Sequence, residues 1–269
     1  MPAILLHLPA ASIYIGLAIA YRRLQGETTA RQQFLARFAL LGALLLHAAS
    51  LGLDITDGSA PRFGFSAALS MTLWLALVFY WIESFFAHIE GLQALAMPVA
   101  AVAVLLPTIF PSEHALPNAS TLAFRMHFVV AMLAYSLFTL AALHALLMAA
   151  AEKQLHSARL TRALASLPPL MTLESLLFKL VAVGFVLLTL TVGSGVFFSE
   201  ALFGKALSLS HKTVFAIAAW LLFGVLLTGR MLWGWRGRRA LRLTLAGFTC
   251  LLLAYVGTRF VLEVLLGRP

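Results

Sequence analysis

Long apolar runs alternate with short polar segments along the whole chain. The predicted membrane spans are 3–21, 35–53, 66–86, 93–110, 122–150, 172–197, 209–232 and 241–265. Each is close to the ~20 residues that an α-helix needs to cross a bilayer. None shows the strict apolar–polar alternation of a membrane β-barrel strand. Because backbone groups in lipid must bond within their own segment, the pattern predicts an all-α, polytopic membrane protein with about eight transmembrane helices.

The composition supports this fold class. The chain has 269 residues, of which 62% are hydrophobic and 11% are charged, whereas soluble domains have about 45–50% and about 25%. A soluble enzyme and a disordered chain are therefore excluded. No polar linker or internal repeat divides the sequence, so residues 1–269 are expected to form a single membrane domain. The net charge of +9 does not indicate nucleic-acid binding, because basic residues of a membrane protein first report its topology.

Lys and Arg residues gather in alternate loops, which predicts the orientation. Most of the 19 basic residues follow spans 1, 5 and 7 or lie at the ends of these spans. Cytoplasmic loops carry the excess of Lys and Arg, so both termini are predicted on the outer, periplasmic side. No Lys or Arg precedes the first apolar run, and we therefore expect a retained helix rather than a cleaved signal peptide.

Histidines are the candidates for metal chemistry, since the one cysteine, Cys250, excludes disulfides, CxxC sites and covalent haem attachment. A ligating residue inside a membrane span is a functional candidate. Four of the eight histidines are predicted at span ends or in loops: His7, His88, His114 and His156. His144 lies towards the inner end of its span, where an interhelical hydrogen bond is expected.

His127 and His211 are predicted at the outer ends of two different spans, at the same depth. That placement suits two axial ligands of one iron. His127 shares a helical stripe with Ala131, Ala134 and Phe138, and small residues beside a histidine leave room for a porphyrin edge. The alternative is that the small residues only allow the helices to pack closely.

Further outer-side residues add to this candidate site. Arg125 and Lys212 flank the two histidines and are suited to the carboxylates of haem propionates, although they also suit lipid phosphates. His47 lies in the second span, seven residues before Asp54. It is either a further iron ligand or part of a polar helix end, and the sequence does not decide between them.

Three segments of the C-terminal half are similar to the cytochrome c assembly protein family, the CcsA-like membrane haem handlers. A family helix with an outer-side haem-ligand histidine resembles RMHFVVAMLAYSLF at 125–138. The segments before and after the family's tryptophan-rich haem-binding loop resemble LESLLFKLVAVGFVLLTLTVGSGVFFSEALFG at 173–204 and GWRGRRALRLTLAGF at 234–248. The similarity is strongest over 122–265. It implies haem ligation by His127.

One departure from the family bears on activity. The family's cytochrome c synthases carry a WWD loop where this chain has ALFGKALSLSHKTVFA at 201–216, which contains no tryptophan. The pattern resembles the WWD-lacking, YpjD- and HemX-like branch. His211 stands in this segment, and its pairing with His127 is our inference from the departure. Synthase activity, and enzyme activity in general, is not expected.

The residues and the resemblance predict a multi-pass protein of the bacterial inner membrane that binds haem b non-covalently on its outer side. His127 and His211 would be the axial ligands, and the role would be haem handling linked to cytochrome c-type assembly. The expected partners are the lipid bilayer, haem, and a protein of cytochrome assembly or haem biosynthesis. The alternatives are a non-enzymatic regulator or scaffold of haem biosynthesis, acting through the basic loops at 151–168 and 233–242, and a transporter.

Overall fold

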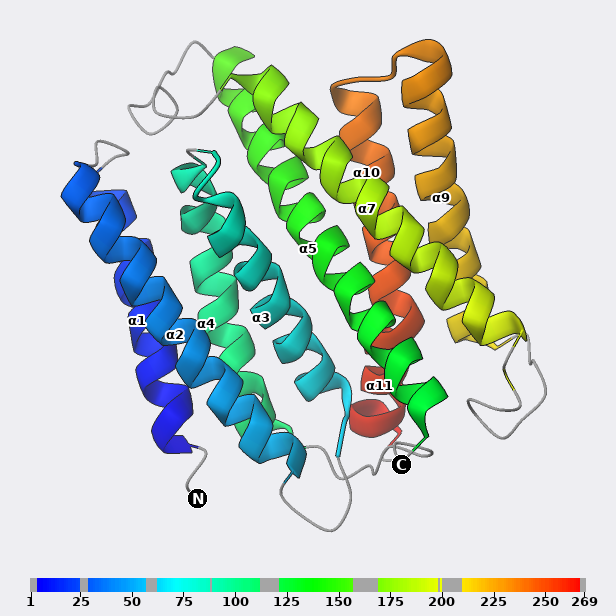
Figure 1. The fold of residues 1–269 in the computed structure, drawn as a ribbon, viewed down its shortest axis with the longest axis horizontal. Helices are drawn as coiled ribbons and strands as arrows, with labels where there is room; N and C mark the ends of the chain where they lie inside the picture. The colour runs from blue at the N-terminus through cyan, green and yellow to red at the C-terminus, as the bar shows by residue number, and fades with distance from the viewer. Residues whose placement is uncertain are drawn as a thin grey trace.

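The chain folds into long helices in the computed structural model. The structure describes residues 4–24, 29–56, 62–87, 89–111, 121–156, 169–197, 199 and 210–266, and these contain no β-strand. The long helices are α1 (Ile4–Leu24), α2 (Ala30–Thr56), α3 (Phe65–Glu83), α4 (Gln93–Ile109), α5 (Leu122–His156), α7 (Leu170–Phe197), α9 (His211–Trp233) and α10 (Arg238–Leu252) (Figure 1). The all-α prediction is confirmed, and each helix overlaps one predicted span.

The last helix continues beyond α10 with two widened turns. The π-helical segments η2 (Leu253–Gly257) and η3 (Val261–Leu265) enclose the short α11 (Thr258–Phe260). In the described residues, seven helical segments are long and apolar enough to cross a membrane, while α4 has 17 residues and is shorter. The helix between α3 and α4 is the single 3-10 turn η1 (Glu90–Leu92).

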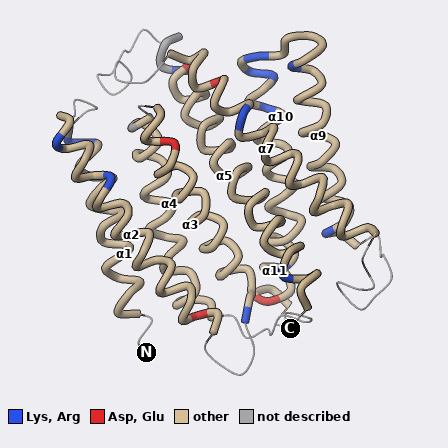
Figure 2. Tube along the Cα trace, viewed as in Figure 1, with Lys and Arg blue, Asp and Glu red and all other residues tan. Residues whose placement is uncertain are grey.

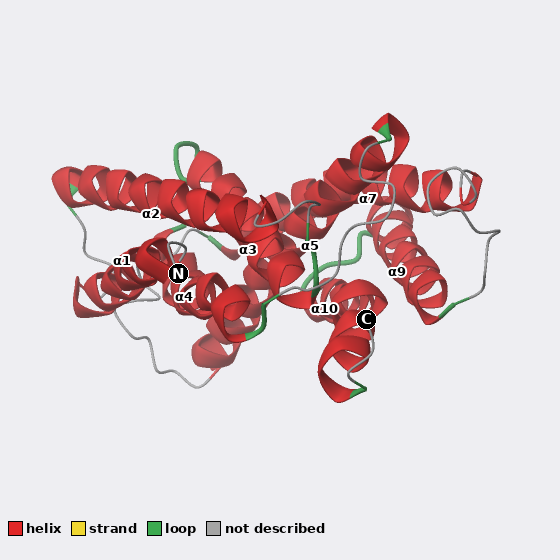
Figure 3. Ribbon diagram, turned by 90° about the horizontal axis from the view of Figure 1, so that it is seen from below, coloured by secondary structure: helices red, strands yellow, loops and turns green. Residues whose placement is uncertain are grey.

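The helices form two bundles joined along α3 and α5. The N-terminal bundle contains α1 to α4, and the C-terminal bundle contains α5, α7, α9 and α10. Figure 3 shows them as two groups of helices, with α1, α2 and α4 on the left and α7, α9 and α10 on the right. Within the C-terminal bundle α5 packs against α7 and α10, and α9 packs against the same two helices, so α5 and α9 lie diagonally opposite.

Two phenylalanines and two glycines fill the middle of the C-terminal bundle. Phe138 of α5 and Phe223 of α9 are fully buried, and their rings stack with centroids 3.8 Å apart. A Cβ at Gly184 of α7 would meet the Phe138 ring at 3.1 Å, and a Cβ at Gly247 of α10 would meet Phe223 at 2.8 Å. Each ring therefore packs directly on the backbone of a neighbouring helix, a contact that a larger side chain would block.

Charged residues collect at both ends of the molecule. We call the end that holds Arg22, Arg37 and Arg230 the basic end, and the end at which both termini lie the terminal end (Figures 1 and 2). At the basic end Arg230 Nη1 donates to Glu174 Oε1 at 2.7 Å, and Arg238 Nε donates to Glu152 Oε1 at 2.7 Å. The common position of the termini agrees with an even number of spans.

Candidate functional site

His127 lies at the terminal end of α5, half-buried against α7. Its Nδ1 is 2.8 Å from Ser194 Oγ, and that hydroxyl donates to the backbone oxygen of Thr191 at 3.1 Å. When the Ser194 hydroxyl donates to Thr191, its oxygen can accept from His127, and that pairing would put the proton of the neutral imidazole on Nδ1. A hydrogen bond to one ring nitrogen is the arrangement that orients a metal-ligating histidine.

The helix beside His127 presents backbone rather than bulky side chains. A Cβ at Gly195 would lie 3.7 Å from His127 Cε1, and a Cβ at Gly193 would meet no atom within 4 Å. Gly195 therefore presents backbone to the imidazole, whereas Gly193, about 200° further round the helix, lies on the other side of α7. The backbone at Gly195 leaves room for the edge of a flat ring, and together with a histidine oriented by Ser194 the residues present fit haem.

Cations and one carboxylate gather nearby at the same end. Arg259 Nη1 lies 3.6 Å from Glu263 Oε1, and Glu263 Oε2 accepts the Phe65 backbone N–H at 3.1 Å. Lys212 is within electrostatic range of both Arg259 and Glu263. Glu263 thus satisfies the first turn of α3, where a carboxylate also complements the helix dipole. The sequence analysis missed Glu263, although its spacing of four residues from Arg259 in an apolar helix was a usable signal.

Arg125 and Lys212, the two cations predicted beside the histidines, differ in their exposure to solvent. Arg125 is exposed on α5, two residues before His127. Lys212 is half-buried, and it lies in register with the buried positions Ala219, Phe223 and Leu226 of α9. The interior stripe of α9 therefore begins at Lys212, which directs this cation towards the bundle.

His211 is the first residue of α9 and is exposed. It is one position away from the interior stripe of that helix. His127 and His211 belong to diagonally opposite helices and to the same end of the C-terminal bundle. Among the described residues there is no group of three or more His, Cys, Asp or Glu side chains arranged to hold a metal ion.

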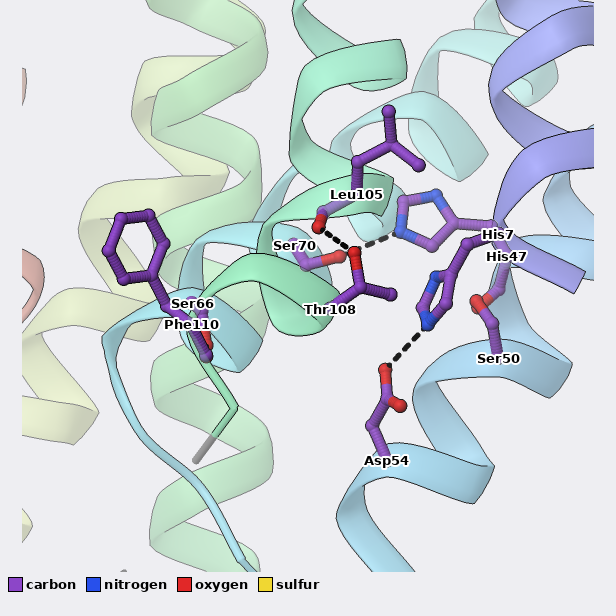
Figure 4. A network of polar contacts seen from close by, with 9 residues as sticks. All are labelled: His7, His47, Ser50, Asp54, Ser66, Ser70, Leu105, Thr108 and Phe110. Carbon is purple, nitrogen blue, oxygen red and sulfur yellow. Dashed lines mark hydrogen bonds and ion pairs between the residues drawn. The ribbon is translucent and has the colours of Figure 1, made fainter. Parts of the chain in front are cut away.

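His47 lies in the N-terminal bundle, within a buried polar network (Figure 4). Its Nδ1 is 3.2 Å from the Tyr14 hydroxyl, and its Nε2 is 2.9 Å from Ser70 Oγ. The imidazole is fully buried. Both ring nitrogens have hydroxyl partners from neighbouring helices, and the structure does not bring His47 together with His127.

His7, which the sequence analysis assigned to a span end, is part of the same network. The His7 imidazole is fully buried, and its Nε2 lies 3.1 Å from Asp54 Oδ2. Figure 4 shows His7 pointing to Asp54, with the His47 ring beside it. The spacing of seven residues between His47 and Asp54 correctly predicted a shared polar face on α2, but the sequence held no signal that α1 would place His7 on it.

The structure describes only some of the remaining histidines that the sequence singled out. His144 Nε2 of α5 lies 3.4 Å from Glu83 Oε1 of α3, so the expected interhelical partner is present at ion-pair distance without the geometry of a hydrogen bond. His88, His114 and the segment 200–209, which corresponds to most of the family's WWD loop, lie outside the described residues, as does the side chain of His156.

Comparisons with known proteins agree with this architecture. The model of the family described as Cytochrome C assembly protein matches residues 34–266. The inner membrane protein YpjD of Escherichia coli K12 is 35% identical over 166 residues, which cover 62% of each chain. An uncharacterized 28.8 kDa protein of Azospirillum brasilense is 35% identical over 144 residues, covering 53% of this chain and 52% of that protein.

A shorter match links the chain to proteins named for cytochrome c biogenesis. The cytochrome c biogenesis protein CcsA of Prochlorococcus marinus subsp. pastoris is 35% identical over 89 residues, covering 33% of this chain and 28% of that protein. The chain thus aligns with less than two thirds of the length of these relatives. The family model nevertheless covers most of the sequence, and the chain belongs to the cytochrome c assembly protein family.

Proposed function

We propose that this chain binds haem b non-covalently at the terminal end of its C-terminal bundle, with His127 as an axial ligand. The proposed role is haem handling in cytochrome c-type assembly. Membership of the family supports the general role. The observation that carries the proposed site is the contact of His127 Nδ1 with Ser194, which itself contacts Thr191, because such a contact orients a ligating imidazole.

His211 is the proposed second axial ligand. Two neutral imidazoles give a low-spin iron centre, which is spectroscopically distinct from a centre with one histidine. His211 is exposed at the first residue of α9, where a side chain has freedom to turn. The pairing therefore requires the His211 side chain to lie towards α5 when haem is bound, and the spectrum of a variant tests this requirement.

The nearby cations suit the two carboxylates of haem. Lys212 lies at the interior register of α9, Arg259 lies beside it, and Arg125 is exposed near His127. Arg and Lys are the usual partners of carboxylates. A bound haem would supply an iron that changes oxidation state, while the residues named here would hold the ring, orient the imidazole and balance the propionate charge.

The proposal assigns no catalytic role to the chain. The segment 201–216 contains no tryptophan, whereas the resemblance implies that synthases present haem to apocytochrome through a tryptophan-rich loop at this place. We further propose that the protein resides in a bacterial inner membrane with both termini outside. That orientation leaves the basic end on the cytoplasmic side, as the positive-inside rule requires. A protein of cytochrome assembly or haem biosynthesis is the proposed partner.

Absorption spectra of purified variants test the proposed site. Wild-type protein in mild detergent, oxidised and then reduced with dithionite, should show a low-spin b-type spectrum. His127→Ala should lose haem, and His211→Ala should become high-spin or lose haem. His47→Gln is the matched control, because it removes a buried histidine whose nitrogens contact Tyr14 and Ser70, and its spectrum should not change. Full haem content with an unchanged spectrum in His127→Ala would overturn the proposal.

A further inference from the structure

A groove opens between α5 and α10 at the basic end. It has a volume of about 410 Å³ and is lined by Ala149, Glu152, Lys153, Arg238, Leu241, Arg242 and Leu245. The lining residues of α10 recur at intervals of three or four, so they share the helix face that meets α5. The groove lies at the opposite end of the molecule from His127, and nothing in the proposed haem site uses it.

The rim of the groove carries an excess of positive charge. Three cations, Lys153, Arg238 and Arg242, face a single carboxylate, Glu152. Arg238 Nε donates to Glu152 Oε1 at 2.7 Å, and this pair largely cancels. Lys153 and Arg242 are both exposed, and no carboxylate of the described residues pairs with either. Two cations are therefore available to an anionic group at this rim.

The floor of the groove is apolar and extends away from the rim. Ala149 lies one helical turn further from the basic end than Lys153, and Leu241 and Leu245 lie three and seven residues further from it than Arg238. The stacked Trp233 and Trp235 lie between α9 and α10 at the same end, and tryptophans concentrate where a membrane meets water. The cations and tryptophans thus put the rim at headgroup level and the floor at the level of acyl chains.

We propose that this groove is a binding site for an anionic phospholipid. Lys153 and Arg242 bind the phosphate and the anionic headgroup, and an acyl chain lies along Ala149, Leu241 and Leu245. A soluble phosphate ion would leave the apolar floor without an occupant. An acidic peptide would expose its backbone to the hydrocarbon region at the floor, which is costly. The proposal concerns the basic end alone and does not depend on haem binding.

Native mass spectrometry with an equimolar mixture of phosphatidylglycerol and phosphatidylcholine tests the site. Wild-type protein should retain phosphatidylglycerol preferentially. Each of Lys153→Gln and Arg242→Gln should weaken that retention about fivefold, corresponding to roughly 1 kcal/mol per basic residue near an anionic headgroup. Arg239→Gln is the matched control, since Arg239 is exposed on the first turn of the same helix and does not line the groove.

A second variant separates the acyl chain from the headgroup. Ala149→Phe fills the floor without changing the charge, so it should displace the two-chain lipid. Soluble glycerol phosphate should not compete with the lipid in wild-type protein. The thermal unfolding midpoint in detergent is measured for every variant, to compare only folded proteins. Equal retention of the two lipids by wild type, an Arg239→Gln effect as large as that of Arg242→Gln, or full competition by glycerol phosphate would each overturn the proposal.

Discussion

His7 and His47 of the N-terminal bundle differ from His127 of the C-terminal bundle in how their neighbours surround them. In the N-terminal bundle, His7 and His47 are fully buried and face Asp54, Tyr14 and Ser70. In the C-terminal bundle the middle is filled by aromatic rings on glycines, and His127 lies half-buried at the rim. His47, which has a hydroxyl beside each ring nitrogen, stabilises helix packing, whereas the half-buried His127 is the residue that we propose as a haem ligand.

Neighbouring residues, rather than depth in the membrane, create this difference. Tyr14 and Ser70 each place a hydroxyl on one nitrogen of His47 from a different helix. Beside His127, α7 contributes the Ser194 hydroxyl to Nδ1 and the backbone of Gly195 to the edge of the ring. The polar network of His7, His47 and Asp54 should therefore determine the stability of the N-terminal bundle. The residues around His127 should determine ligand binding.

The largest stability effect is expected from filling the aromatic centre. Gly247→Leu places a side chain where a Cβ alone would lie 2.8 Å from Phe223, so the Phe138–Phe223 stack must open. We expect the free energy of unfolding to fall by about 3 kcal/mol, at the upper range for overpacking. Unfolding by SDS titration measures the change. Gly52→Leu is the control, because no atom lies within 4 Å of its Cβ position, and an equal loss there would remove the contrast.

A smaller loss of stability is expected from the polar network, with no effect on haem. Asp54→Asn removes the carboxylate that faces the buried His7 at 3.1 Å. Breaking one side of a buried pair costs about 3 kcal/mol or more, and the partial exposure of Asp54 reduces this to about 2 kcal/mol. The same SDS titration, with the haem spectrum recorded in parallel, is the measurement. A changed haem spectrum at normal stability would contradict the separation between the two bundles.

The orientation of His127 should affect haem affinity more than the free energy of unfolding. Ser194→Ala removes the hydroxyl that accepts from His127 Nδ1. Loss of such a second-sphere partner typically lowers metal affinity about 10–100-fold, and about tenfold weaker haem binding is expected here. Haem titration followed by absorbance gives the affinity. Ser194→Thr keeps the hydroxyl and should restore most of it; if the threonine variant is as weak as the alanine variant, the hydroxyl is not the cause.

The smallest effect is expected at an exposed hydrogen bond between α7 and α9. Trp220 Nε1 donates to Thr189 Oγ1 at 2.9 Å. Hydrogen bonds between membrane helices contribute about 0.6 kcal/mol on average, so Thr189→Val should lower the free energy of unfolding by roughly that amount. SDS titration resolves such a change only against replicate wild-type curves. A fall in the free energy of unfolding above about 2 kcal/mol would contradict the view that the Phe138–Phe223 core, rather than this hydrogen bond, holds α7 and α9 together.

The sequence predicted the helices well and the site only in part. Hydropathy alone placed the eight long helices of the described residues, because a bilayer imposes both their length and their apolar character. Helical spacing also predicted that Ala134 and Phe138 lie on the interior face with His127. Spacing within one helix carries no information about the rotation of another, so the exposure of His211 and the His7–Asp54 contact were not predictable. Ser194 was missed for the same reason, since its partner lies 67 residues away.

The most direct test of the central claim is chemical rescue of a cavity variant. His127→Gly protein is purified, and its haem absorption spectrum is recorded with and without added imidazole. If His127 is an axial ligand, the variant should lack the low-spin spectrum, and free imidazole should restore it. A low-spin spectrum in the variant before imidazole is added, identical to that of wild type, would contradict haem ligation by His127.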